Sequence, residues 1–171
     1  MIGTAAIAAG VNRFIQLNTI SVSGGALDLR NNDLIVRAMS YASVESLVKS
    51  GFGDFDWHGS GITSSIAANF AETDGSRAIG VIDNTDWRYS NFDGETIANT
   101  DILVKFTYAA DPNLDGLVDN DDFGQFFYGL GGSGSPRWLN GEFDLNRVEN
   151  DDFGWFLVGM NAFNASGGVQ L

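Results

Sequence analysis

The chain has 171 residues, a formal net charge of −13 and an apolar content of 44%. This length allows one medium domain or two small ones, and the apolar content is sufficient for a packed core. So acidic a chain lacks the basic surface that nucleic-acid binding requires. The absence of cysteine excludes disulfides, thiol catalysis and zinc–thiolate sites. No apolar stretch is long enough to predict a membrane span.

The first hundred residues predict β-structure. Residues 15–22 alternate apolar and polar side chains, as a half-buried strand does. Glycine, asparagine and aspartate turns separate this segment from further predicted strands at 26–30, 34–37, 78–82 and 102–108. One helix is expected at 43–50, with Ser43 as its N-cap and Lys49 in its last turn. The pattern predicts a β-rich domain at residues 1–109, a β-sandwich or the end of a β-solenoid, with one short helix.

Several side chains of this segment are candidates for chemistry. His58, the only histidine, follows Trp57 in a predicted turn, but no Gly-x-Ser-x-Gly nucleophile elbow accompanies it. Asp54 and Asp56 could form a glycosidase carboxylate pair, and Trp57 and Trp87 could stack on sugars. A surface histidine and core aromatics are the ordinary interpretations of these residues. We therefore expect no enzyme activity and keep polysaccharide binding as an alternative.

Residues 111–122 have the spacing of a calcium-binding loop of the EF-hand type. Such a loop takes oxygen ligands from positions 1, 3, 5, 7, 9 and 12 and needs glycine at position 6. Gly116 lies at position 6, and Leu117 at position 7 offers its backbone carbonyl. The other ligand positions carry Asp111, Asn113, Asp115, Asp119 and Asp122. Position 12 is usually the longer glutamate, so we expect a Ca²⁺ shell that is reshaped but not abolished.

A second, altered copy of this pattern follows. Residues 119–129 recur as 149–159, and such internal duplication indicates a repeated structural unit. The residues that correspond to loop positions 1, 3, 5 and 12 are Glu142, Asp144, Asn146 and Asp152. The glycine of position 6 is missing and Arg147 follows Asn146 directly, so this loop is one residue short. Whether it holds a second Ca²⁺ stays open at this point.

Each loop is followed by a predicted helix. Apolar residues recur at helical spacing in both, and the two sets are Phe123, Phe126, Phe127 and Leu130, and Phe153, Phe156, Leu157 and Met160. We expect the two stripes to pack against each other, because neither helix can bury its apolar face alone. Residues 110–171 therefore predict a small helical domain built from two calcium loops, each leading into one helix.

The stretches 111–123 and 141–153 resemble a type I dockerin, of the kind at the C-terminal end of planctomycete surface proteins. The resemblance covers about residues 109–164 and implies an EF-hand pair. It also implies docking onto a cohesin through loop positions 10 and 11, which are here Asn120, Asp121, Asn150 and Asp151. Passages such as 26–36, 57–65 and 103–108 are similar to the autotransporter-like β-repeat region that precedes such dockerins.

Together these features predict a non-catalytic structural or assembly protein that is secreted or exposed on the cell surface. Its expected partners are other protein chains, bound by self-assembly or as a cohesin-like partner. The alternatives are a docking module for such a partner and the carbohydrate-binding tail of a polysaccharide-active enzyme. Residues 1–10 lack the cationic start of a signal peptide, and we expect the chain to be the C-terminal piece of a longer protein or a mature form.

Overall fold

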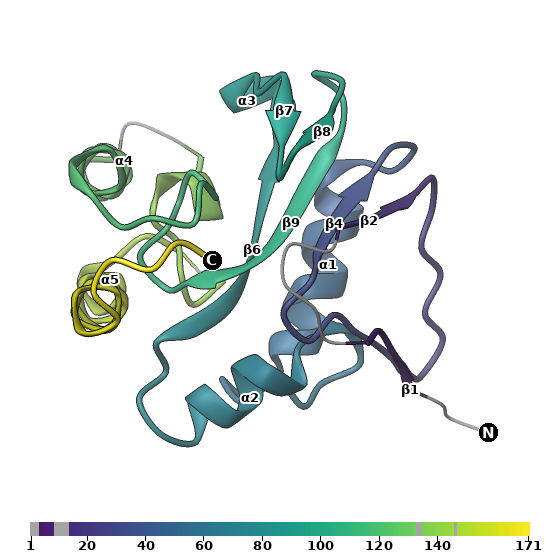
Figure 1. Ribbon diagram of the computed structural model, residues 1–171, viewed down its shortest axis with the longest axis horizontal. Coiled ribbons are helices and arrows are strands. Elements are labelled where there is room, and N and C mark those ends of the chain that lie inside the picture. The colour runs from purple at the N-terminus through teal and green to yellow at the C-terminus, as the bar shows by residue number, and fades with distance from the viewer. Residues whose placement is uncertain (1–3, 9–13, 133–134, 146) are drawn as a thin grey trace.

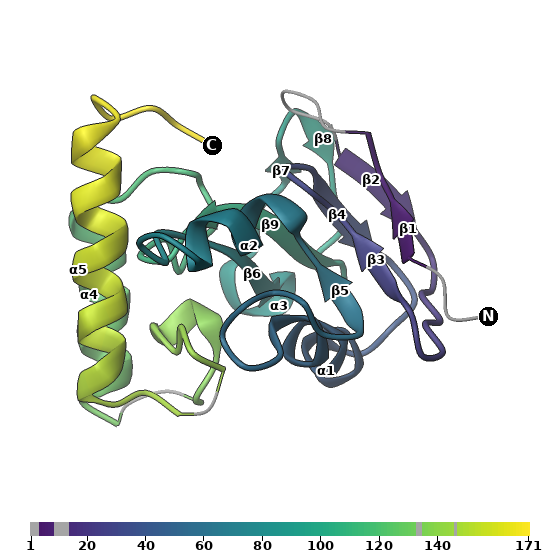
Figure 2. The ribbon, with the colours of Figure 1, turned by 90° about the horizontal axis from the view of Figure 1, so that it is seen from below.

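The protein has a mixed α/β fold in which helices and sheets share one core (Figure 1). The computed structural model describes residues 4–8, 14–132, 135–145 and 147–171. The first strands lie at one side of the molecule, and the two longest C-terminal helices stand together at the opposite side (Figure 2).

Within these described residues the strands form three sheets. The first sheet is wholly parallel and contains β1 (Thr4–Ala6), β3 (Ala26–Asp28) and β5 (Gly61–Thr63). The second has the order β2-β4-β9-β6 and contains β2 (Phe14–Leu17), β4 (Asp33–Val36), β9 (Ile102–Tyr108) and β6 (Arg77–Asp83). In it β2 is parallel to β4, whereas β9 is antiparallel to both of its neighbours. A short antiparallel pair joins β7 (Asn91–Phe92) to β8 (Glu95–Thr96).

Three helices belong to the described part of the first hundred residues. They are α1 (Tyr41–Phe52), α2 (Ser65–Ala71) and α3 (Asn84–Trp87). Ser40 caps α1 by accepting a hydrogen bond from the Ser43 amide, and Ser64 caps α2 in the same way from Ala67. Parallel strands need a crossover connection, and α1 lies in the connection between the parallel neighbours β3 and β5.

The fold class predicted from the sequence, a β-sandwich or solenoid end plus a small helical EF-hand pair, is wrong. The structure is instead mixed α/β, with five α-helices in its described residues. One physical reason is that α2 has only seven residues, so its helical periodicity covers just two turns and is hard to separate from loop sequence. The other is that the N-cap of α1 is Ser40, three residues before the expected Ser43, and the helix extends to Phe52, beyond the predicted range.

The C-terminal part begins directly at the end of β9. Here α4 (Asn120–Leu130), a 3-10 helix η1 (Trp138–Asn140) and α5 (Asn150–Ala165) follow one another. The cluster of buried apolar side chains extends across the predicted boundary at residue 109 and includes Tyr108, Leu114 and Trp138. A Cβ atom at Gly80 of β6 would lie 2.6 Å from Trp138 Nε1 and 2.4 Å from Leu114 Cδ2. The first predicted calcium loop is therefore packed directly on the sheet. The division into two domains stays a prediction.

Among the described helices, none combines the length and the apolar character needed to cross a bilayer.

Candidate metal centre

The first loop, residues 111–122, connects β9 to α4. Gly116 has a φ of +81°, the left-handed conformation that favours glycine. A Cβ atom there would also lie 2.2 Å from the carbonyl oxygen of Leu171, so a side chain has no space. The C-terminal residues hold this point of the loop: Gln170 Nε2 donates to the Asp115 carbonyl at 2.6 Å, and the Leu171 amide donates to the Gly116 carbonyl at 3.2 Å.

Backbone amides of the first loop bind its own carboxylate and amide side chains. The Asp115 amide donates to Asn113 Oδ1 at 2.8 Å, and the Leu117 amide donates to Asp115 Oδ1 at 2.9 Å. The Asp121 amide donates to Asp119 Oδ1 at 2.8 Å, at the start of α4. These bonds turn the Asp115 and Asp119 carboxylates toward the loop backbone.

Two further carboxylates of this loop are completely buried. Asp111 and Asp122 are 0% exposed, and Oδ1 of each finds no hydrogen-bond partner among the described residues. Burial raises the pKa of Asp111 to about 7; burial, together with the neighbouring Asp111 charge, raises the pKa of Asp122 to about 8. Burying a carboxylate without a compensating partner is costly. A bound cation would supply what these two oxygen atoms lack.

Contacts from β9, η1 and the segment between α3 and β7 fix the position of the first loop. Trp138 Nε1 donates to the Asp111 carbonyl at 2.8 Å, and Tyr89 Oη donates to the Asn113 carbonyl at 3.2 Å. Thr107 Oγ1 of β9 donates to Asp111 Oδ2. The sequence analysis missed Tyr89, Thr107 and Trp138, because the motif gives the ligands of a loop but no sign of which distant residues support it.

The second loop, residues 142–152, brings three acidic side chains together. Glu142, Asp144 and Asp152 are 1%, 7% and 0% exposed. Their ligand oxygen atoms all lie within 4.8 Å of one another. This buried acidic triad could hold a metal ion. Asn146, the remaining predicted ligand of this loop, lies outside the described residues.

Asp152 is held by the backbone of the second loop. Its Oδ1 accepts from the Phe143 amide at 2.7 Å and its Oδ2 from the Glu149 amide at 2.8 Å. Burial raises the pKa of Asp152 to about 6, against the opposing effect of these donors. The motif favoured the first loop as the metal site. Within the described residues, however, the close group of three acidic side chains belongs to the second loop. The carboxylates of the first loop do not form such a group, and backbone amides bind Asp115 and Asp119 there.

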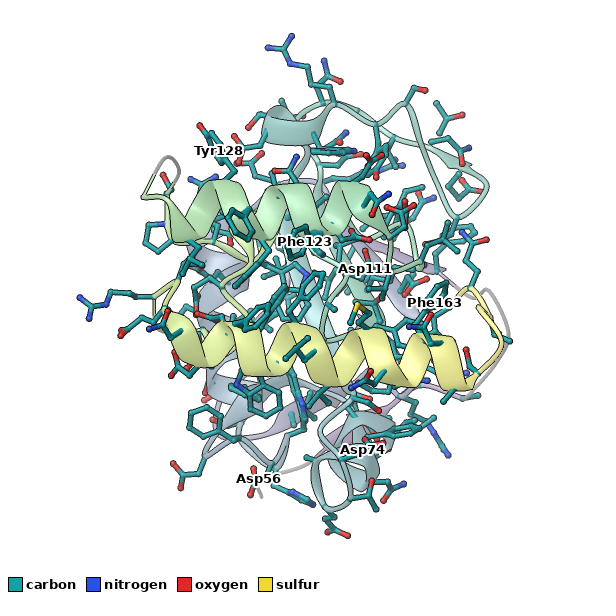
Figure 3. All side chains as sticks on the ribbon, turned by 90° about the vertical axis from the view of Figure 1, so that its left-hand side faces the viewer. Asp56, Asp74, Asp111, Phe123, Tyr128 and Phe163 are labelled. Atoms are coloured by element: carbon teal, nitrogen blue, oxygen red, sulfur yellow. The ribbon has the colours of Figure 1, made fainter. Side chains whose placement is uncertain are left out.

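The four predicted partner-binding residues do not come together. Asn120 and Asp121 open α4, Asn150 and Asp151 open α5, and all four are exposed. The two helices are antiparallel, as Figure 3 shows: Asp111 marks the beginning of α4, and Phe163 lies near the same end on the last turns of α5. The two pairs of residues therefore lie at opposite ends of the helix pair.

The helical stripes pack against each other only in part. Phe126 and Phe156 are 0% and 2% exposed, with ring centroids 5.4 Å apart. Leu130 and Met160 are half-buried, and the other four apolar side chains form an exposed α4–α5 patch, which we define as Phe123, Phe127, Phe153 and Leu157, with exposures of 42%, 57%, 40% and 37%. Phe123 lies between the two helices in Figure 3, and its ring centroid is 5.6 Å from that of Phe156.

The other candidates from the sequence are not assembled into a catalytic group. His58 Nδ1 lies 3.7 Å from Asp56 Oδ2, and both side chains are more than half exposed. Ser60 Oγ is 3.0 Å from Ser50 Oγ, in a pair of surface hydroxyls. Trp57 is 3% exposed and packs on Phe52, so its ring face is not open to a sugar.

No family model, curated protein or solved structure matches this chain.

Proposed function

We propose that residues 111–122 and 142–152 bind Ca²⁺, and that the chain is a non-catalytic structural or assembly protein of the extracellular space or cell surface. One observation carries the proposal: Asp111 and Asp122 are fully buried, and each has an oxygen atom without a partner among the described residues. They occupy the first and last positions of the calcium-loop spacing. The location outside the cell rests on the resemblance to dockerins.

The chemistry of the ligands favours calcium over other metals. Both loops offer oxygen atoms from carboxylates, an amide and backbone carbonyls, and such hard donors suit Ca²⁺ and Mg²⁺. Mg²⁺ demands a near-octahedral shell and usually keeps several waters, whereas Ca²⁺ accepts six to eight oxygen ligands in a flexible shell. A loop with ligands at positions 1, 3, 5, 7, 9 and 12 fits the larger ion better.

The position of the sites supports a stabilising role. The first loop contacts β9, η1 and the C-terminal residues at once, so an ion there would hold the sheet and α4 together. A ligand that binds only the native state stabilises it by about 2.7 kcal/mol at a hundredfold excess over its dissociation constant. For a chain of this size that corresponds to a rise in melting temperature of roughly 5 to 10 °C.

Calorimetry with a matched pair of variants tests the proposal. Calcium uptake is measured by titration of the chelator-treated protein, and the melting temperature is compared with and without calcium. Asp122→Asn should abolish most of the calcium-dependent rise. Asp54→Asn changes an exposed carboxylate outside both loops and should behave like the wild type. A wild-type protein that takes up no calcium and melts identically in chelator would refute the proposal.

A second function, docking onto another protein, is favoured by the exposed α4–α5 patch. Its four apolar side chains lie between the acidic first turns of α4 and α5, which carry Asp121 and Asp151. Contiguous exposed apolar surface often marks a protein-binding site. A separate partner would present an apolar surface flanked by lysine or arginine, and the resemblance to dockerins suggests a cohesin-like protein. Another copy of the chain would instead pair its own apolar patch with this one.

Light scattering of the calcium-loaded chain tests assembly through this patch. Phe127→Ser should reduce the apparent mass if copies associate there. Val169→Ser removes an apolar side chain of similar exposure, 55%, outside the patch and should leave the mass unchanged. If the wild-type protein stays strictly monomeric at high concentration, the patch does not serve self-assembly. The patch would then bind a separate partner protein, which cross-linking can identify.

A further inference from the structure

The two loops differ in the hydrogen bonds that they donate to the carboxylate in the first turn of their helix. Asp122 and Asp152 are the third residues of α4 and α5, and Oδ2 of each accepts from the N-cap amide at 2.8 Å. The second oxygen distinguishes them. Asp152 Oδ1 accepts from the Phe143 amide at 2.7 Å, whereas Asp122 Oδ1 is buried and has no partner within the described chain.

The residue at loop position 2 explains this difference. Leu114 and Leu145 have φ values of +63° and +64°, which set position 4 of both loops in the same unusual conformation and align them. In this alignment Phe143 corresponds to Pro112. Proline carries no amide hydrogen, so the first loop has no donor at the place where the second loop binds its aspartate.

The missing donor changes what holds each loop closed. In the second loop, backbone donors fix Asp152 in position even though Glu142 and Asp144 repel it. In the first loop, Asp122 is fixed on one side only and faces the buried Asp111 charge. An amide bonded to a carboxylate also competes with a cation for the same oxygen. Pro112 therefore leaves Asp122 Oδ1 available to a cation and unsupported when the cation is absent.

We propose that loop position 2 sets how far each loop depends on its cation: Pro112 makes the first loop depend on it, and the Phe143 amide lets the second loop stay closed without it. This inference rests on the proposed binding of a divalent cation to the two loops. Withdrawal of calcium should then open residues 111–122 and the first turn of α4 before it opens residues 142–152.

Amide hydrogen exchange of the intact chain, in calcium and in excess chelator, tests the inference. In the wild type, chelation should speed exchange across residues 113–125 at least about tenfold, the size expected for losing the interactions of a charged group, and should affect residues 147–156 much less. Pro112→Ala supplies the missing donor and should shrink the effect in the first loop. It should also weaken calcium binding there several-fold, because the new amide competes for Asp122 Oδ1.

The chain provides a matched control, since its other proline is Pro136, which is exposed. Pro136→Ala has the same effect on the entropy of the unfolded chain but should leave both loops unchanged. If Pro112→Ala fails to fold, Phe143→Pro compared with Phe143→Leu tests the second loop instead. Both lose the aromatic ring, and only the proline variant loses the donor, so only that variant should make residues 147–156 sensitive to chelation.

The outcomes separate the two proposals. A wild type that takes up no calcium overturns the proposed function and this inference together. Calcium uptake with equal deprotection of both loops, or with the second loop opening first, overturns only the inference. The inference alone is also overturned if amide exchange of the Pro112→Ala variant in chelator matches that of the Pro136→Ala variant.

Discussion

Raising the pH of the calcium-free protein from about 5.5 to about 7 should destabilise it. Asp111 and Asp122 have pKa values raised to about 7 and about 8 in the folded chain, first of all by burial. In the unfolded chain both should titrate near the ordinary value of about 3.9. Across this pH window the native state therefore binds more protons than the unfolded state. The stabilisation that these two protonated groups contribute is fully present below about pH 4 and is lost as the pH rises through their folded pKa values.

The expected loss follows from the linkage relation. Each group that is protonated only in the native state removes about 1.4 kcal/mol of unfolding free energy per pH unit. The Asp111 charge raises the pKa of Asp122, so the two groups titrate as a coupled pair, and we count at least one proton for the pair across this window. The loss between pH 5.5 and pH 7 is then at least about 2 kcal/mol. Urea unfolding followed by circular dichroism, in excess chelator, measures it directly.

Calcium and one substitution provide the controls. Saturating calcium neutralises the carboxylates in the native state and should flatten the pH dependence. Asp122→Asn removes one of the two coupled groups and should reduce the slope in chelator, whereas Asp54→Asn should leave it unchanged. The reasoning is wrong if the calcium-free wild type becomes more stable as the pH rises through this window.

Three further predictions concern single side chains and are measured by chemical denaturation. Gly116→Ala should destabilise the protein by about 1 to 3 kcal/mol because of its positive φ and the Leu171 carbonyl. Gly124 lies inside α4 with open space around a Cβ atom, so Gly124→Ala should stabilise the protein by about 0.5 to 1 kcal/mol. If both glycine variants changed the unfolding free energy in the same direction, this account would be wrong. Trp138→Phe should cost about 1 to 3 kcal/mol, since it leaves the Asp111 carbonyl without its indole donor, while Trp87→Phe at a half-buried position should cost less. Lys105→Met should cost about 3 to 5 kcal/mol, because Lys105 is buried and its Nζ lies 3.1 Å from the buried Asp33 and 2.7 Å from Asp93. The exposed Lys49→Met is its control, and similar costs for both would show that the buried ion pairs contribute little.

Local sequence patterns predicted the elements that short-range chemistry decides. The strand expected at 102–108 has the observed bounds of β9, and a helix follows each loop as the apolar spacing indicated. The need for glycine at position 116 was also visible, since the motif places an unusual backbone conformation there. Each of these features depends on residues that are close together in the chain.

Features that depend on distant residues were not predictable in this way. The fold class was wrong because the pairing of β3 with β5 across α1 leaves no local signature in the sequence. The contacts from Tyr89, Thr107 and Trp138 to the first loop join segments that no motif connects. The sequence also treated the second loop as the weaker one, because a missing glycine is visible in a motif and the convergence of three carboxylates is not.

The place of Trp138 gives the molecule an intrinsic optical probe. Its indole is 0% exposed and is bonded to the main chain of Asp111, the first predicted ligand of the first loop. Indole emission responds to polarity and to nearby charge, so filling or emptying this loop should alter the fluorescence spectrum of the unlabelled protein. Stopped-flow mixing with a chelator could then time the departure of the ion without any dye.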